Sequence, residues 1–211
     1  MKKPIIAILF LSLVGAIATV PAFAGTLYTN GPVDGTFSGW TIDSGLSVSD
    51  SFTLAQASTL TGADFSVWLF PGDTLTSVDW SIGVTPYDGS EEAGTAMPTG
   101  VLEFVNEYGF SIDAESFSIP SLSLPAGTYW LTLQNASTSL GDQVFWDINN
   151  GPSIAFESYY GNVNGNEEPG SNSDAFDIYG ASAATPEPSS FLLLGSGLLG
   201  FASVMGRRGR A

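Results

Sequence analysis

The chain has 211 residues and a formal net charge of −16, with 21 Asp and Glu against five Lys and Arg, and it contains no His and no Cys. All five basic residues lie near the ends, so residues 25–185 carry 20 acids without a base, a formal charge of −20. This composition excludes nucleic-acid binding through basic patches, and it excludes zinc sites and catalysis that depend on Cys or His.

The first 24 residues have the layout of a secretory signal peptide. Two lysines precede an apolar run over residues 5–20, and small residues follow at Ala22 and Ala24. Signal peptidases cleave after such a small-x-small triplet, so we predict export and cleavage after Ala24. A permanent membrane anchor is the alternative, but the apolar run is short and a polar chain follows it directly.

Short segments that alternate apolar and polar side chains follow one another through residues 25–180. In one of them Val78, Trp80 and Ile82 alternate with polar residues, which is the period of a half-buried strand and places Trp80 in the core. In another, Asp50 interrupts the apolar side of the pattern. The predicted strands cover residues 46–54, 65–69, 78–84, 101–105, 115–119, 128–133, 144–148, 154–159 and 176–179.

Clusters of Gly, Pro, Asn, Asp and Ser separate these segments, and none of the segments has the 3.6-residue apolar period of a helix. The sequence therefore predicts an all-β domain over residues 25–180, a β-sandwich for which a jelly roll is one compatible topology. The polar stretch 162–174 is predicted to be a surface loop, and the small residues 181–185 are predicted to be a linker.

The excess of acids in this domain has three explanations, which the sequence leaves open. It raises solubility through charge repulsion, it suits a saline medium that screens the charges, or it binds calcium through oxygen ligands. The predicted calcium ligands are Asp142, Asp147 and Asn149, which cluster near a turn. A second polar cluster lies in the loop, at Asn162, Asn164, Asn166, Glu167 and Glu168. Neither cluster has EF-hand spacing, and no other cofactor is predicted.

Sugar binding is the chemistry that the remaining residue types favour. Tyr159 and Tyr160 stand beside the polar loop, where exposed aromatic rings can stack on a neutral sugar. A glycoside hydrolase would need two carboxylates. Four glutamates lie on or near predicted strands, at Glu103, Glu107, Glu115 and Glu157. A polar residue between apolar neighbours in a strand usually faces solvent, so we predict no catalytic residues and no enzyme activity.

The last 26 residues of the chain fall into three parts. The parts are the tripeptide Pro186, Glu187 and Pro188, an uncharged stretch over residues 189–206, and a basic end over 207–211 that contains Arg207, Arg208 and Arg210. Eighteen uncharged residues are close to the lower limit for a transmembrane helix. The arginines after them are expected to stay in the cytoplasm by the positive-inside rule, as a membrane-stop basic cluster. An ordinary single-span anchor is the alternative.

This tripartite tail resembles the C-terminal sorting signal of PEP-CTERM proteins. The resemblance assigns residues 186–188 to the signature tripeptide and residues 189–206 to its transmembrane helix. It implies processing by an exosortase, a membrane-embedded transpeptidase-like enzyme of Gram-negative bacteria, and an association with exopolysaccharide production. Many members of the family have Val before the tripeptide, where this chain has Thr185. The resemblance covers the tail alone.

The two ends and the acidic domain together predict an exported protein of the cell surface or extracellular matrix. The tail implies a membrane-anchored precursor that an exosortase processes after signal peptidase has acted at the other end. The domain is predicted to be a structural or binding module associated with exopolysaccharide or biofilm, with extracellular polysaccharide as its expected partner. A secreted carbohydrate-active enzyme that uses paired carboxylates is the alternative.

Overall fold

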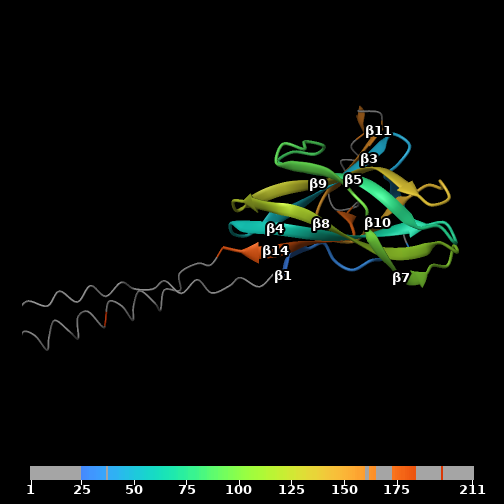
Figure 1. Ribbon diagram of the computed structural model, residues 1–211, viewed down its shortest axis with the longest axis horizontal. Coiled ribbons are helices and arrows are strands. Elements are labelled where there is room, and N and C mark those ends of the chain that lie inside the picture. The colour runs from blue at the N-terminus through green and yellow to red at the C-terminus, as the bar shows by residue number, and fades with distance from the viewer. Residues whose placement is uncertain (1–24, 37, 160–161, 165–172, 184–195, 197–211) are drawn as a thin grey trace, which may run out of the picture. The chain divides into compact units, whose positions relative to one another are not determined.

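The body of the protein is built from antiparallel strands that form two sheets (Figure 1). The computed structural model describes residues 25–36, 38–159, 162–164, 173–183 and 196. By its internal contacts, the chain separates a compact unit, Ala22–Ala183, from its two ends. The fold below is that of this unit.

One sheet has six strands in the order β12-β11-β3-β9-β5-β6. In that order the strands are β12 (Asn162–Asn164), β11 (Ala155–Tyr159), β3 (Leu46–Leu54), β9 (Gly127–Thr138), β5 (Leu75–Gly83) and β6 (Glu92–Ala96). Strands β3 and β5 both pair with the long β9, so segments far apart in the sequence are neighbours in this sheet.

The other sheet has eight strands, and its main path runs β1-β14-β4-β10-β13. These strands are β1 (Gly25–Thr29), β14 (Phe176–Ser182), β4 (Ser58–Leu69), β10 (Phe145–Asn149) and β13 (Ser173–Asp174). Three more complete the sheet, namely β2 (Gly39–Thr41), β7 (Thr99–Val105) and β8 (Ser111–Leu124). Strand β2 pairs with β10, β8 pairs with β4, and β7 pairs with β8.

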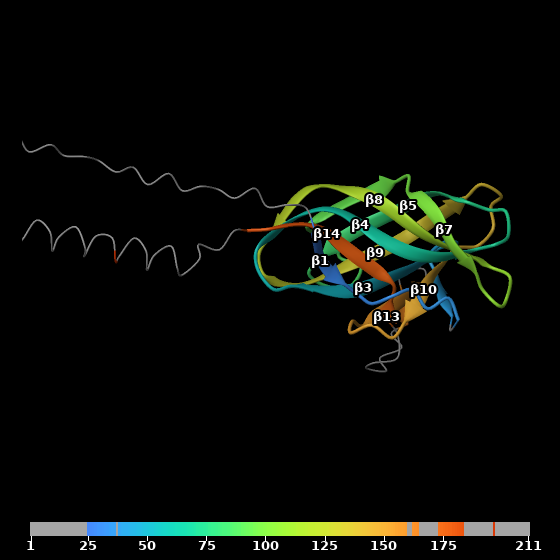
Figure 2. The same ribbon diagram turned by 90° about the horizontal axis from the view of Figure 1, so that it is seen from below.

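Apolar side chains from both sheets fill the space between them. Figure 2 shows β1, β14 and β4 of the eight-stranded sheet side by side. Phe52 of β3 lies 6.4 Å from Phe176 of β14, measured between ring centroids, and Trp80 of β5 lies 5.5 Å from Phe117 of β8. Trp146 of β10 is fully buried. Since the inner faces of the two sheets pack on each other, the architecture is a β-sandwich, and Trp80 belongs to its core as the sequence predicted.

All nine predicted strands are present, and β3 has the predicted bounds of residues 46–54. The sequence did not predict β1, β2, β6, β12 and β13. These strands have two to five residues each, and β6 reads Glu-Ala-Gly-Thr-Ala without a large apolar side chain. Their strand geometry comes from hydrogen bonding to a longer neighbour, as β6 bonds to β5, and a local sequence pattern does not encode it.

The expectation of a surface loop over residues 162–174 was wrong at both ends of that stretch. Asn162–Asn164 forms β12 against β11, and Ser173–Asp174 forms β13 against β10. Ser173 and Asp174 are buried, with 3% and 0% of their surface exposed. Polar composition predicted exposure here, but hydrogen bonds to β10 and to Asp50 hold this segment inside the molecule.

The chain crosses between the sheets repeatedly, from β3 to β4 to β5 and again along β8, β9, β10 and β11. This alternation is compatible with a jelly roll, which stays a prediction. The predicted signal peptide and the predicted membrane helix over residues 189–206 lie outside the described residues, except for Ser196, which is helical. Within the described part of the chain, no helix is long and apolar enough to cross a membrane.

Candidate functional site

A buried polar centre lies between the two sheets and begins at Asp50 in the middle of β3. Asp50 alternates with Val48 and Phe52, which both belong to the core, so its side chain also points toward the other sheet. The side chain is fully buried. A carboxylate at an inward-facing position is costly unless its oxygens are bonded, so its partners show how the fold accommodates it.

Three donors contact one oxygen of Asp50. Its Oδ2 accepts hydrogen bonds from Asn30 Nδ2 at 3.0 Å and from Ser153 Oγ at 2.8 Å. It also accepts a bond from the backbone N–H of Asp174 at 2.7 Å. Burial nevertheless raises the pKa of Asp50 to about 7, because desolvation outweighs these hydrogen bonds. The hydrogen bonds therefore offset only part of the cost of burying a charged carboxylate at Asp50.

Asn30 connects the elements around this centre. Its Nδ2 lies 2.6 Å from Ser153 Oγ, 2.7 Å from Ser173 Oγ and 2.6 Å from the carbonyl oxygen of Asp174. Its Oδ1 accepts a hydrogen bond from the Tyr28 hydroxyl at 2.7 Å. Burial, followed by the nearby charge of Asp50, raises the pKa of Tyr28 to about 12, so this hydroxyl keeps its proton and donates it.

Asp174 has no such compensation. Its backbone pairs with Ile148 of β10, a core residue, so its side chain lies on the inner face of the sheet. Both carboxylate oxygens are buried and neither has a hydrogen-bond partner. Burial raises its pKa well above the ordinary value, and the charges of Asp50, Asp147 and Glu157 raise it further. A buried carboxylate without donors requires an explanation, because such groups are almost always bonded.

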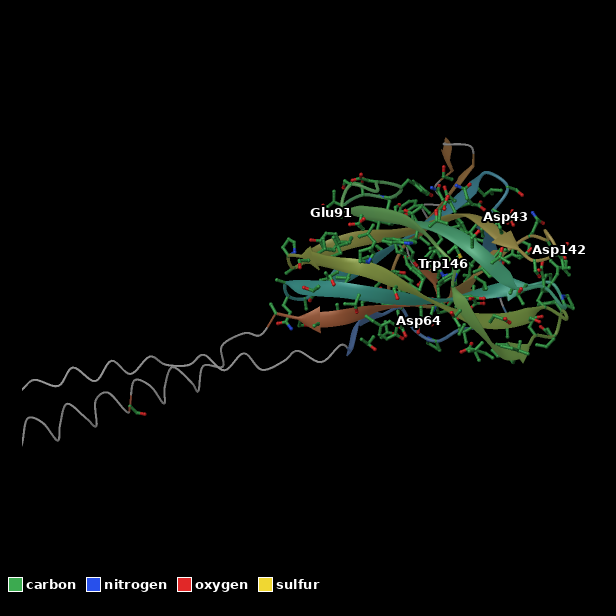
Figure 3. All side chains as sticks on the ribbon, viewed as in Figure 1. Asp43, Asp64, Glu91, Asp142 and Trp146 are labelled. Atoms are coloured by element: carbon green, nitrogen blue, oxygen red, sulfur yellow. The ribbon has the colours of Figure 1, made fainter. Side chains whose placement is uncertain are left out.

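The three residues predicted to bind calcium do not share one environment. Asp142 is exposed in the loop before β10, and Figure 3 shows it at one end of the sandwich. Asp147 and Asn149 are buried side by side on one face of β10. The Asp147 carboxylate accepts three hydrogen bonds, from Asp34 N at 2.8 Å, Gly35 N at 2.9 Å and Trp68 Nε1 at 2.6 Å. These bonds hold the loop between β1 and β2 against the sheet.

Asn149 has a similar role in holding that loop. Its Nδ2 donates to the carbonyl oxygens of Asn30 at 2.8 Å and Pro32 at 3.1 Å. Its Oδ1 accepts bonds from Gly151 N and from Ser173 Oγ, both at 2.9 Å. Because its amide nitrogen donates hydrogen bonds and its amide oxygen accepts them, Asn149 links the loop, β10 and β13 into one network around the buried centre.

A second feature is a hollow of about 270 Å³ on the outer face of the eight-stranded sheet. Asp64 and Ser66 of β4 line its floor, with Asp177 from β14 beside them and Glu103 of β7 at its side. Asp64 is labelled in Figure 3. The loop residues 31–33 form another wall. The lining is rich in hydrogen-bond acceptors and contains no cationic side chain.

Aromatic side chains continue from this hollow along the same strand. Trp68 follows Asp64 and Ser66 at alternate positions of β4, so the three side chains lie on one face. The ring of Tyr108 stacks on Trp68 with centroids 6.3 Å apart and an angle of 20° between the planes. Tyr108 is 61% exposed. The outer face thus presents acceptors and an accessible aromatic ring in a row.

The tyrosines predicted from sequence to contact sugar lie elsewhere. Tyr159 ends β11, on an edge region of the six-stranded sheet, and the structure does not describe its side chain. Tyr160 lies outside the described residues. Tyr108 lies with Phe110 in the turn between β7 and β8, and no sequence signal distinguished it. Its place beside the hollow depends on stacking against Trp68 of β4, which is distant in the sequence.

The expectation that strand glutamates face solvent was wrong for Glu115. It lies opposite Phe65 of β4 and Gly100 of β7, and only 2% of its surface is exposed. The absence of a side chain at Gly100 leaves room for the carboxylate, since a Cβ there would lie 2.3 Å from Glu115 Oε1. Burial and then the charge of Asp113 raise the pKa of Glu115 to about 7.

Comparison with known protein families gives a match in the tail. Residues 184–208 match the PEP-CTERM protein-sorting motif. The tail therefore carries a PEP-CTERM protein-sorting motif. The matched range contains Pro186, Glu187 and Pro188, as well as Arg207 and Arg208. A search of curated proteins found no match to the chain. The motif implies an exported, membrane-anchored precursor in bacteria that an exosortase processes for sorting to the cell surface.

Proposed function

We propose that this PEP-CTERM protein is a polysaccharide-binding component of the extracellular matrix, released to the surface of a Gram-negative cell after processing at both ends. The sorting motif over residues 184–208 is the observation that carries the proposal. The signal-peptide pattern of residues 1–24 supports it, because a signal peptide would direct the chain to export, and the tail is processed during that export. The body is then the part that acts in the matrix.

The outer hollow supports a sugar as the ligand of the body. Asp64, Asp177 and Ser66 offer oxygens that accept hydrogen bonds from sugar hydroxyls. Tyr108 offers a ring face on which a sugar can stack. The row from Asp64 to Trp68 spans about 13 Å at the usual rise of a strand, which suits an extended chain rather than a single small molecule. Since the body has no Lys, Arg or His, its polysaccharide would be neutral.

Binding to immobilised polysaccharides tests this function. The full chain, purified in mild detergent, is expected to bind a neutral polysaccharide and to ignore anionic ones. Asp64→Asn and Tyr108→Ala should each weaken the interaction at least tenfold, in line with about 1.4 kcal/mol for a tenfold change. Asp142 is an exposed acid that does not line the hollow, so Asp142→Asn is the matched control and should bind normally. Equal binding by all four proteins would refute the proposal.

A secreted carbohydrate-active enzyme is the alternative function. Asp113 and Glu115 are two positions apart on β8 and the pKa of both is raised, which resembles the paired carboxylates of glycosidases. Glu115 is 2% exposed, however, so a sugar cannot reach it without movement of β7 or β8. We therefore favour binding without catalysis. Release of new sugar ends during the binding assay, abolished by Glu115→Gln, would favour the enzyme instead.

A further inference from the structure

We propose that the body binds one calcium ion between its two sheets, with the carboxylates of Asp50 and Asp174 as the charged ligands. No single strand carries this site. Asp50 comes from β3 of the six-stranded sheet and Asp174 from β13 of the eight-stranded sheet, and the backbone N–H of Asp174 bonds to Asp50 Oδ2 at 2.7 Å. The ion would therefore join the two layers of the sandwich.

The carboxylate of Asp174 is the observation that points to a ligand. It is fully buried, it lies on the inner face beside Asp50, and neither of its oxygens has a hydrogen-bond partner among the described residues. Proteins rarely leave a buried carboxylate in this condition, since the loss of hydration is not repaid. A bound cation would supply the missing partner for both oxygens.

The composition of the body narrows the choice of cation. Residues 25–185 contain no Lys, Arg or His, so no side chain of this segment can neutralise Asp50 and Asp174. Two carboxylates balance one divalent ion, whereas sodium would leave a buried negative charge.

The ligand atoms are all oxygens, which selects a hard cation. No group of three acidic side chains among the described residues is arranged to hold a metal, so neutral oxygens and water must complete the coordination. Ser153 Oγ and Ser173 Oγ lie 2.8 Å apart beside Asp50 and supply such oxygens. Calcium accepts six to eight oxygens in a flexible arrangement, but magnesium demands a strict octahedron and releases its water reluctantly. We therefore assign calcium.

A third carboxylate, that of Glu157, lies near this interior position and is partly exposed. Glu157 pairs with Val48 of β3 and so lies on the same inner face, but its side chain is only half-buried. Burial raises its pKa, and its charge in turn raises the pKa of Asp174. Glu157 is thus a third carboxylate whose charge acts on Asp174, and it is more exposed than Asp50 and Asp174. The site differs from the sequence-based candidates, because the Asp147 oxygens are already bonded to three donors and Asp142 is exposed.

Thermal melting of the full chain in detergent tests the site. The protein is stripped with EDTA and then titrated with CaCl2 or MgCl2 at constant ionic strength. Calcium at about 100 times its Kd is expected to raise Tm by roughly 5–10 °C, because a ligand of the native state stabilises it by mass action. Magnesium at the same concentration should give less than half of this shift. Isothermal titration should show one calcium per chain.

Single substitutions test which residues cause the calcium-dependent rise in Tm. Asp174→Asn removes an unpaired buried charge, so it should fold, yet lose the calcium shift; Asp142→Asn should keep the full shift. Glu157→Gln is a milder second variant, expected to weaken calcium binding at least threefold while leaving the core intact. A wild-type protein that ignores calcium overturns the proposal, whether or not the variants fold. A calcium shift that is the same in the wild type and in both Asp174→Asn and Glu157→Gln would also overturn it, by placing the ion elsewhere.

Discussion

At the scale of single residues, the buried acids determine how the stability of the body depends on pH. The pKa of Glu115 is raised from 4.5 to about 7, mainly by burial, so the folded protein holds this proton more tightly than the unfolded chain. Stability is therefore highest below about pH 4.5 and falls as the pH rises toward 7. The pKa of Asp50 is raised in the same direction, from 3.8 to about 7. In the absence of calcium, both groups therefore contribute more stability in mild acid than at neutral pH.

Substitution of Glu115 by Gln measures this contribution. The amide has the shape of the acid without its charge, so the variant lacks the part of the pH dependence that Glu115 causes. Between pH 4 and pH 8, unfolding free energy should fall by about 2–3 kcal/mol more in the wild type than in Glu115→Gln. Denaturant unfolding with EDTA at each pH checks this. The exposed Glu91→Gln is the control and should follow the wild-type curve. Parallel curves for wild type and Glu115→Gln would contradict the burial argument.

At the scale of elements, the sequence of the sorting tail predicts separate roles for the tripeptide and for the apolar stretch that follows it. Proline disfavours helix, so the prolines on both sides of Glu187 lead us to expect a tripeptide that an enzyme can reach. The apolar stretch, by contrast, needs only length and hydrophobicity to reach the membrane. Changes in the tripeptide should thus affect processing without affecting insertion.

Glu187→Ala, expressed in cells that carry the exosortase, tests whether the tripeptide affects processing alone. We expect an unprocessed precursor that stays in the membrane fraction. The variant lacks one residue of the tripeptide that the exosortase recognises, while its membrane segment is unchanged. Intact-mass measurement of the C-terminus, together with membrane fractionation, detects the difference. Glu91→Ala in the body is the control and should be processed fully. An identical C-terminus in Glu187→Ala and wild type would show that the tripeptide is not read.

At the scale of the whole molecule, the charge of −20 over residues 25–185 acts on stability through self-repulsion. Sodium chloride should raise Tm gradually as the Debye length falls from about 30 Å at 0.01 M to about 10 Å at 0.1 M. Melting curves recorded with EDTA separate this screening from calcium binding. A Tm that does not change with salt would mean that the acids are too well hydrated or too far apart to repel measurably.

Some features of this protein were predictable from the sequence because they are local. The tail is a contiguous motif, and its identity was confirmed by the match over residues 184–208. The alternation of side chains along a strand depends only on backbone geometry, so the all-β class and the bounds of β3 followed directly. Core positions such as Trp80 followed from the same alternation.

The buried polar centre was decided by the tertiary structure. Asp50 stood out as an acid on an apolar side, but its partner Asp174 is 124 residues away in a stretch with the composition of a loop. Glu115 is buried because its register with Phe65 turns it inward, and register is a property of two strands rather than one. Local periodicity predicts which elements form. Which carboxylates meet between the sheets depends on long-range strand pairing, which no local pattern contains.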